Sequence, residues 1–263
     1  PAVAVSLAPS FAGVFPAEAA RRLPTALHRL GFSKVCETAV GARYSALACR
    51  QHVDNNADRF VIGSACPAVV RYVERYQPDL TGCLMPVPSP MAVHARMLRD
   101  ELPENGAVVF IGPCVAKKAE ALRSDVADLV DAVLTFEELR EWLDQEAICL
   151  DDLPPGTFDD LPGPSARLYP LAGGLLRTAG MPTDMLSERH IALSGFDNLK
   201  EALENHAQKT VLEHLVCRDG CINGPAAATA RNIAASRAEL LTDCESAPVL
   251  ADDAPIPVSS AVV

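Results

Sequence analysis

Short apolar runs alternate along the chain with longer segments in which apolar residues recur every three or four positions. The apolar runs predict buried strands at residues 2–7, 33–39, 59–63, 106–111, 131–135 and 190–195. The periodic segments predict helices at residues 17–30, 42–53, 68–76, 91–102, 115–123, 136–147, 199–208 and 226–241. This alternation of strands and helices predicts an α/β fold.

We expect two lobes within residues 1–245, each with a mixed β-sheet flanked by helices. The first lobe is predicted to span about residues 1–104 and the second about residues 105–245. Thr135, with Glu138 three residues on, is typical of a helix capping box. The Gly173-Gly174 pair inside an apolar run indicates a close approach of two backbone segments. The tail at 246–263, rich in Ala, Pro and Val, is predicted to be disordered.

The charge balance narrows the range of partners. The chain of 263 residues carries 23 Lys and Arg against 34 Asp and Glu, a net charge of −11. A phosphate backbone would be repelled, so nucleic acid is not expected as a partner. No run reaches the ~18–20 apolar residues that cross a bilayer, and we therefore expect no membrane span and a cytoplasmic location.

Nine cysteines, an odd number in a chain of this length, do not fit a secreted disulfide scaffold. Five of them lie in ordinary sequence contexts and are expected to be buried free thiols: Cys36, Cys49, Cys83, Cys149 and Cys244.

Two of the other four cysteines share one arrangement: a strand, then Gly, one or two residues, Cys and a helix. Cys66 follows the predicted strand 59–63, and Cys114 follows the predicted strand 106–111. Each thiol would lie at the carboxyl end of a strand, where open α/β sheets bind ligands. It would also lie at the amino end of a helix, whose dipole favours the thiolate by about 0.3–1 kcal/mol.

The remaining two, Cys217 and Cys221, lie four positions apart in the segment VLEHLVCRDGCINGP (211–225). On one helical turn this spacing would place both sulfurs on the same face. In a loop, Gly220 and Gly224 would let the backbone approach whatever the sulfurs bind. Four thiolates are the usual ligands of a [4Fe–4S] cluster, and they also bind structural zinc. Zinc sites usually present two tight cysteine pairs, so two single ligands from distant turns favour a cluster buried between the lobes.

Three stretches resemble the cysteine signatures of the [FeFe]-hydrogenase catalytic domain, which holds the H-cluster: GSACPAVV (63–70), GPCVAKKAE (112–120) and CRDGCINGP (217–225). Four further stretches fall in the order of that family: Ala8-Pro9, Ser89-Pro90, DAVLTFEEL (131–139) and AGGLLRT (172–178). The resemblance covers roughly residues 2–240, and it places the cofactor in the cleft between the lobes.

The resemblance implies a role for each matching residue. Cys66, Cys114 and Cys217 would hold the [4Fe–4S] part of the H-cluster, and Cys221 would also bridge to a di-iron unit carrying CO, cyanide and a dithiolate. Lys117 matches the family lysine that contacts a cyanide ligand. Hydrogen bonds to the cyanides are expected from Ala8-Pro9 and Ser89-Pro90, because buried anionic ligands require donors or a cation. Glu120 matches a structural acid. The implied reaction is the reversible conversion of H2 to protons and electrons.

The sequence departs from the family at the position that passes protons to the cofactor. A cysteine precedes the first ligand in fast hydrogenases, and here that position is Ala65, whose methyl group cannot carry a proton. The family's acidic pair on the proton exit route falls on Ala48 and Cys49, and other departures are Gly112, Leu215, Met91, Val69 and Pro225-Ala226. Because a positioned proton-transfer group typically contributes ~10²–10⁴-fold in rate, we expect slow turnover. With the LYPLAGGLLRT stretch, this pattern resembles a branch of the family that senses hydrogen.

Other functions stay open at this point. The protein could be an ordinary hydrogenase with a rerouted proton path, for which the candidate relay residues are Ser64, His94, Cys49 and His214. It could instead be an iron–sulfur assembly relative that lacks the di-iron unit, or a zinc protein. The expected electron partner is a ferredoxin-type carrier or a fused iron–sulfur module, because no CxxCxxC run exists in this chain. A downstream signalling domain is a further expected partner.

Overall fold

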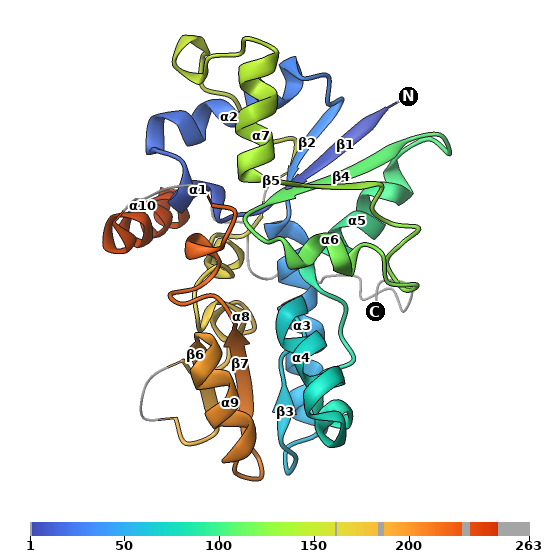
Figure 1. Cartoon of the computed structure of the whole chain (residues 1–263), viewed down its shortest axis with the longest axis vertical. Helices are drawn as coiled ribbons and strands as arrows, with labels where there is room; N and C mark the ends of the chain where they lie inside the picture. Colours follow the sequence, from blue (N-terminus) through green and yellow to red (C-terminus); the bar gives the residue numbers. More distant parts are fainter. Residues whose placement is uncertain (1, 161, 184–186, 228–231, 247–263) are drawn as a thin grey trace.

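The computed structural model describes residues 2–160, 162–183, 187–227 and 232–246 (Figure 1). The tail predicted at 246–263 falls outside these residues, apart from Ser246 at the end of a helix. Two β-sheets flanked by helices confirm the predicted α/β fold. We expected mixed sheets, but every described strand pair is parallel. The reason is that each connection between paired strands is a long crossover, through helices or through the other sheet.

The first sheet has the strand order β2-β1-β4-β5. Its strands are β1 (Val3–Leu7), β2 (Lys34–Glu37), β4 (Ala107–Gly112) and β5 (Ala132–Thr135). Helices α2 (Ala17–Arg29) and α7 (Phe136–Gln145) cover one face, and α5 (Pro90–Glu101) and α6 (Ala116–Glu120) cover the other (Figure 1). Residues 4–7 of β1 are fully buried, as expected for a central parallel strand with helices on both faces.

The second sheet has the order β3-β7-β6, with β3 (Val61–Ile62), β6 (His190–Ser194) and β7 (Val211–Leu215). Successive residues face opposite sides. Val61 and Val211 pack with α3 (Ala39–Asn55) and α8 (Gly174–Thr178). Ile62 and Leu212 pack with α4 (Pro67–Tyr76) and α9 (Phe196–Glu204). Two small cores therefore lie on the two faces of this sheet.

The predicted division into lobes near residue 105 is wrong. Strands β1 and β2 pair with β4 and β5, which come after residue 105, and β3 pairs with β7. The chain leaves the first sheet after β2, builds α3, β3 and α4, and returns through α5. It crosses again after α7 to form β6 and β7. Each half is thus assembled from separate stretches, because parallel neighbours require long crossovers.

The remaining elements are the helices α1 (Phe11–Val14) and α10 (Ile233–Ser246) and the 3₁₀ turns η1 (Pro78–Cys83), η2 (Leu150–Asp152), η3 (Pro164–Leu168) and η4 (Cys221–Asn223). The helix predicted at 226–241 begins only at Ile233, where the side chain of Asn232 accepts a hydrogen bond of 2.8 Å from the backbone N–H of Ala234. The predicted capping box of Thr135 and Glu138 is present. None of the helices within the described residues is long and apolar enough to cross a membrane.

The fold brings the carboxyl ends of four strands, β1, β4, β3 and β7, toward one another. In the first sheet the chain runs from β1 outward to β2 and from β4 outward to β5, so the strand order reverses between β1 and β4. Open α/β sheets bind ligands beyond the carboxyl ends of strands at such a switch point. In the second sheet, β3 and β7 end in residues 63–66 and 216–221. The carboxyl ends of both sheets therefore face the middle of the molecule.

Candidate metal centre

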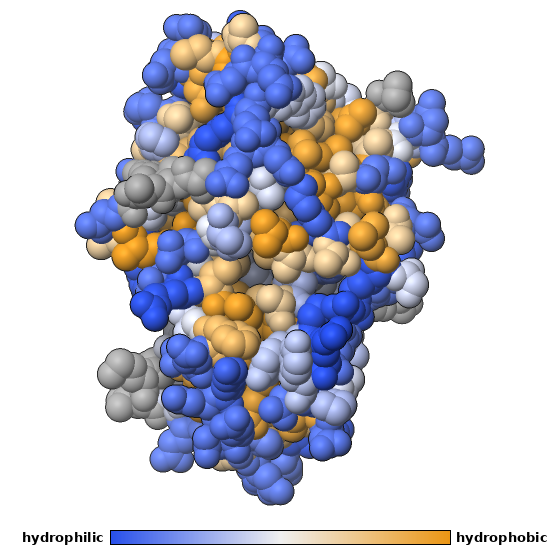
Figure 2. Space-filling model, viewed as in Figure 1, coloured by the Kyte–Doolittle hydropathy of each residue, from blue (hydrophilic) through white to orange (hydrophobic). Residues whose placement is uncertain are grey.

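A cavity of about 290 Å³ lies at the meeting point of the two sheets, and all four predicted cysteine ligands line it: Cys66, Cys114, Cys217 and Cys221. Its walls are otherwise mostly apolar, with Met91, Phe110 and Leu215 among the lining residues. Figure 2 shows apolar side chains gathered across the middle of the molecule, between its two polar ends. These cysteines lie far apart in the sequence, but the strands β3, β4 and β7 that precede them converge and bring them to one cavity.

Cys66 and Cys114 occupy the predicted turns between strand and helix. Cys66 is the N-cap residue of α4, and Pro67 occupies the first helical turn, where a missing N–H costs nothing. Cys114 follows β4, and the backbone N–H groups of Ala116 and Lys117 both favour its thiolate. Burial outweighs these donors, so the pKa of the Cys114 thiol is raised.

Cys217 lies in a loop and Cys221 begins the short 3₁₀ turn η4, so the two are not on a single α-helical turn and the loop alternative is the better description. Gly220 has φ +92°, and a Cβ there would come within 2.1 Å of the carbonyl oxygen of Pro170. The N–H of Cys221 donates a 2.7 Å hydrogen bond to the same carbonyl. Glycine is required because both the left-handed φ and this close approach exclude a side chain.

The four sulfurs are close enough to influence one another. Burial, together with the neighbouring Cys114 and Cys66, raises the pKa of Cys217 to about 12. The pKa of Cys221 is also raised by burial and by the other three thiols, with Lys117 acting in the opposite direction. Four thiolates together in this buried site would need the compensating positive charge of a metal ion or cluster, which replaces the protons of the thiols.

A single zinc ion does not fit this arrangement. Zinc–sulfur bonds of ~2.3 Å keep any two sulfur ligands within about 4.6 Å of each other. Among the described residues, the one group of three potential ligands within 4.8 Å is Cys36, His94 and Asp160. No three of the four cavity sulfurs are that close, whereas an iron–sulfur cube holds its thiolates further apart.

Lys117 is buried, with 8% of its surface exposed, and lines the cavity. Its ammonium donates to Oε2 of Glu120 at 2.6 Å and to Oγ of Ser89 at 3.0 Å. The hydroxyl of Ser89 donates to Oε1 of Glu120. Pro90 lines the cavity, but Ser89 lines a neighbouring pocket instead. The structure thus places Ser89 as a partner of Lys117 and Glu120.

Ala8 and Pro9, the predicted cofactor-binding pair, follow β1 and line the cavity. The N–H of Ala8 is already used, donating to the carbonyl of Ile111 at 2.8 Å. Sequence reasoning missed Ser10, the next residue, which also lines the cavity. Its hydroxyl is buried without a hydrogen-bond partner among the described residues. A buried hydroxyl normally has a partner, so this atom fits a polar or anionic group in the cavity. The sequence feature that could have identified Ser10 is its position directly after the Ala8-Pro9 pair.

Ala65 lines the cavity and also a small adjacent pocket with His214, Glu213 and Tyr169. Burial lowers the pKa of His214 to about 4, and neither ring nitrogen has a partner among the described residues. Cys49 is buried, and its pKa is raised to about 12. Ser64 donates to the carbonyl of Val87 at 2.7 Å and does not line the cavity.

The five other cysteines do not join the cavity. Cys36, Cys49 and Cys244 are buried and Cys83 is half-buried, but Cys149 is exposed, so its predicted burial is wrong. Cys149 follows the end of α7 on the protein surface, next to the acidic turn η2.

The donor set of the cavity fits an anionic iron–sulfur cofactor. It consists of four thiols, the buried cation of Lys117 and the Ser10 hydroxyl, which has no hydrogen-bond partner among the described residues.

Comparison with known proteins agrees with this chemistry. The chain is 24% identical over 276 residues to iron hydrogenase 1 of Clostridium pasteurianum, which covers 85% of this chain and 48% of that protein. It is 38% identical over 87 residues to the cytosolic Fe-S cluster assembly factor NAR1 of Vanderwaltozyma polyspora, covering 33% of this chain and 17% of that protein. The chain therefore spans about half or less of the length of these relatives.

Solved structures share the fold. The E141A variant of [FeFe]-hydrogenase HydA1 from Chlamydomonas reinhardtii matches with a TM-score of 0.76 at 21% identity, covering 94% of this chain and 86% of that one. The family model described as "Iron only hydrogenase large subunit, C-terminal domain" matches residues 1–225. By this match, and with the fold to support it, the chain belongs to the family of the iron-only hydrogenase large subunit, C-terminal domain.

Proposed function

We propose that the chain is an H-cluster domain that binds H2 and converts it reversibly to protons and electrons. The observation that carries this proposal is the convergence of four sulfurs, a buried lysine and the Ser10 hydroxyl on one apolar cavity, the hydroxyl having no hydrogen-bond partner within the described part of the chain. The similarity to iron hydrogenase 1 of Clostridium pasteurianum supports it, because the alignment covers 85% of this chain. When bound, the cofactor would supply the metal site at which the H–H bond is cleaved.

Each residue then has a stated task. Cys66, Cys114 and Cys217 would hold the [4Fe–4S] part, and Cys221 would hold both this part and the di-iron unit. Lys117 would place a positive charge beside the anionic cyanides, and Ala8-Pro9 with Pro90 would shape the wall against them. Ser89 would orient Lys117 through their 3.0 Å hydrogen bond. The apolar lining would exclude water from the reacting atoms.

We further propose that turnover is slow and that the protein acts chiefly in sensing hydrogen. The support is Ala65, which lines the cavity with a methyl group at the position where fast hydrogenases carry a proton-transferring thiol. Electrons would leave to a ferredoxin-type carrier or a fused iron–sulfur module, and a downstream signalling domain would read the state of the site. We propose a cytoplasmic location for this activity.

A second candidate function is iron–sulfur cluster assembly without a di-iron unit. The similarity to NAR1 and to the human nuclear prelamin A recognition factor, 31% identical over 167 residues, favours it. The buried Lys117 argues against it, because a cluster held by four cysteines alone has no cyanide ligand for this lysine to contact.

Infrared spectroscopy after maturation with the di-iron unit separates the two functions. Bands of iron-bound CO and cyanide in the loaded protein are the expected result. A protein that binds a [4Fe–4S] cluster but shows no such bands under the same maturation conditions would support the assembly function and overturn the first proposal. A Lys117→Met variant provides the matched comparison, because a lysine that contacts cyanide shifts the cyanide bands more than the CO bands.

A further inference from the structure

A buried series of polar side chains begins at the cavity wall. Thr38 lines the cavity, and its hydroxyl lies 2.7 Å from Oγ of Ser6. The same Ser6 oxygen lies 2.8 Å from Nδ1 of His94. On the other side of the imidazole ring, Nε2 lies 3.3 Å from Oδ2 of Asp160. Three contacts in series thus connect the cavity with Asp160.

The series starts in the interior and ends at solvent. Ser6 is 0% exposed, His94 1% and Thr38 4%, whereas 18% of the Asp160 side chain is exposed. Each member can both accept and release a proton, or rotate a hydroxyl to do so. Direct contacts between side chains therefore connect the cavity wall with the protein surface.

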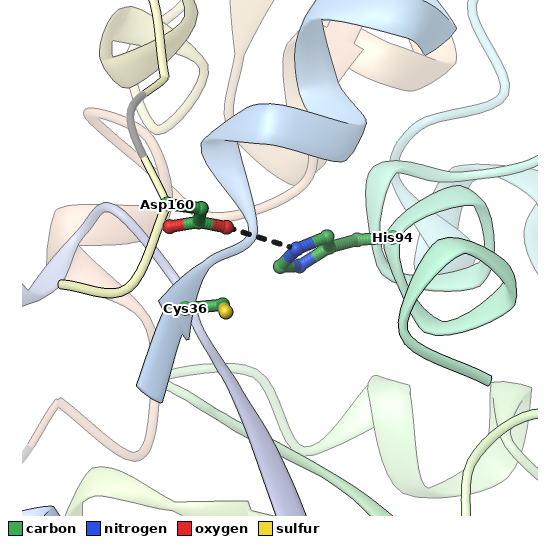
Figure 3. Close-up of side chains that lie close together, drawn as sticks. All are labelled: Cys36, His94 and Asp160. Atoms are coloured by element: carbon green, nitrogen blue, oxygen red, sulfur yellow. Dashed lines mark ion pairs between the residues drawn. The ribbon is translucent and has the colours of Figure 1, made fainter. Parts of the chain in front are cut away.

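The fold holds this series in place from four directions. Ser6 lies on β1, Thr38 precedes α3, and His94 lies on α5. A Cβ on Gly41 would come within 2.6 Å of Cβ of His94, so glycine allows α3 and α5 to approach closely. Asp160 accepts a 2.9 Å hydrogen bond at Oδ1 from the N–H of Glu37. In Figure 3, the Asp160 carboxylate and the His94 ring point toward one another.

Cys36, His94 and Asp160 also meet the distance requirement for a metal ion, since their ligand atoms lie within 4.8 Å of one another. The existing hydrogen bonds favour a different use. Both His94 nitrogens have partners, and both Asp160 oxygens do as well. The Cys36 thiol hydrogen-bonds to Asp160, and burial raises its pKa, which disfavours the thiolate that a metal needs.

We propose that the proton path between the cavity and solvent runs through four side chains: Thr38, Ser6, His94 and Asp160. This inference rests on the proposed function and names the slower route that is left to protons when Ala65 carries no thiol. During H2 oxidation, a proton arriving at Thr38 Oγ1 displaces the Thr38 proton to Ser6. The Ser6 proton passes to Nδ1 of His94, and the proton on Nε2 passes to Asp160 and then to water. Only protons move, and hydroxyl rotation with return of the imidazole tautomer resets the path.

The experiment uses the fully loaded protein and follows its CO and cyanide infrared bands after a rapid change of pH. The path sets how fast the cofactor exchanges protons with solvent, but not the final equilibrium. Asp160→Asn, whose amide cannot take up the proton, is expected to slow the band changes by about 10²-fold while the final spectrum stays the same. Asp159→Asn is the matched control. Asp159 also accepts a hydrogen bond from β2, at 2.7 Å from the N–H of Val35, but it lies outside the path.

Histidine supplies a second test that does not depend on Asp160. His94→Ala is expected to slow the same band changes, and imidazole added to the buffer is expected to restore part of the rate. Nitrogen NMR of the histidine side chains gives a readout without turnover. In the wild type, Nδ1 of His94 is expected as the acceptor of Ser6, and Ser6→Ala is expected to shift that signal.

Two results would overturn the inference. One is an unchanged response rate in both Asp160→Asn and His94→Ala, in proteins that show the CO and cyanide bands. The other is equal slowing in Asp159→Asn and Asp160→Asn, which would assign the effect to the attachment of this loop to β2. A loaded protein without CO and cyanide bands would instead count against the proposed function, so the two failures are distinguishable.

Discussion

The ammonium of Lys117 lies 2.6 Å from Oε2 of Glu120, and both side chains are buried beside the cavity. A charge in this position would be costly alone, since several kcal/mol are lost when an ion leaves water unpaired. Glu120 is satisfied on both oxygens, by Lys117 and by Ser89. The lysine is therefore held at the cavity by its partners before any anionic ligand arrives.

Removing the buried lysine should destabilise the protein far more than removing its neighbour. Lys117→Met leaves Glu120 buried without a cation and is expected to cost about 3–5 kcal/mol. Lys118→Met removes an exposed pair with Glu138, whose side chains are 43% and 41% exposed, and should cost less than about 1 kcal/mol. Urea unfolding at pH 7 measures both. Similar losses in the two variants would contradict the role given to the buried pair.

The four cavity cysteines should be needed for iron, and the other cysteines should not. Cys217→Ala removes one of the four thiolates and is expected to lose most of the bound iron, together with the visible absorption of the cluster. Cys244→Ala changes an equally small thiol that is buried elsewhere, and it should keep both. Iron analysis of the two purified variants provides the comparison. Retention of iron by Cys217→Ala would remove this residue from the ligand set.

Restoring a thiol at Ala65 should increase hydrogen turnover. Ala65→Cys places a proton-transferring group in the cavity wall, and a gain of about 10²-fold is expected in dye-linked H2 oxidation. Ala68→Cys is the control, because Ala68 also lines the cavity but does not occupy the relay position. If the unaltered protein already turns over as fast as Ala65→Cys, the proposal of attenuated activity is wrong.

His214 should make the protein sensitive to acid. Burial lowers its pKa to about 4, whereas the unfolded chain takes up this proton below about pH 6.5. Stability is therefore lost as pH falls from about 6.5 to about 4, and linkage gives about 2 kcal/mol between pH 7 and pH 5. His214→Leu is expected to abolish that part of the loss in urea unfolding.

Glu213, the residue before His214, has the opposite effect on the pH dependence of stability, and it provides an internal control for the histidine. Burial raises the pKa of Glu213 to about 7, so its contribution favours folding as pH falls. Because Glu213 is present in both proteins, the difference between wild type and His214→Leu isolates the histidine. Parallel pH–stability curves for the two proteins would show that His214 takes up its proton equally well in the folded state.

The sequence alone located most of the elements and the four cysteines that line the cavity. Apolar runs and helical periodicity predicted β1, β4, β5 and α7 to within one or two residues, because a strand buried on both faces must be apolar and a capping box is a local pattern. The cysteines were identifiable because Cys66 and Cys114 share one local context, and the Cys217–Cys221 segment has its own glycine pattern. All of these patterns depend only on residues that are close together in the sequence.

Only the tertiary structure decided which stretches lie together. The division near residue 105 was wrong because strand pairing between β1 and β4 depends on a crossover of about a hundred residues, which no local pattern records. The same holds for Ser10, whose missing partner depends on burial, and for the contacts of Ser6 with Thr38 and His94, which come from three distant elements. Side-chain type is written in the sequence, but hydrogen-bond partners and solvent exposure are set by packing between segments far apart in the chain.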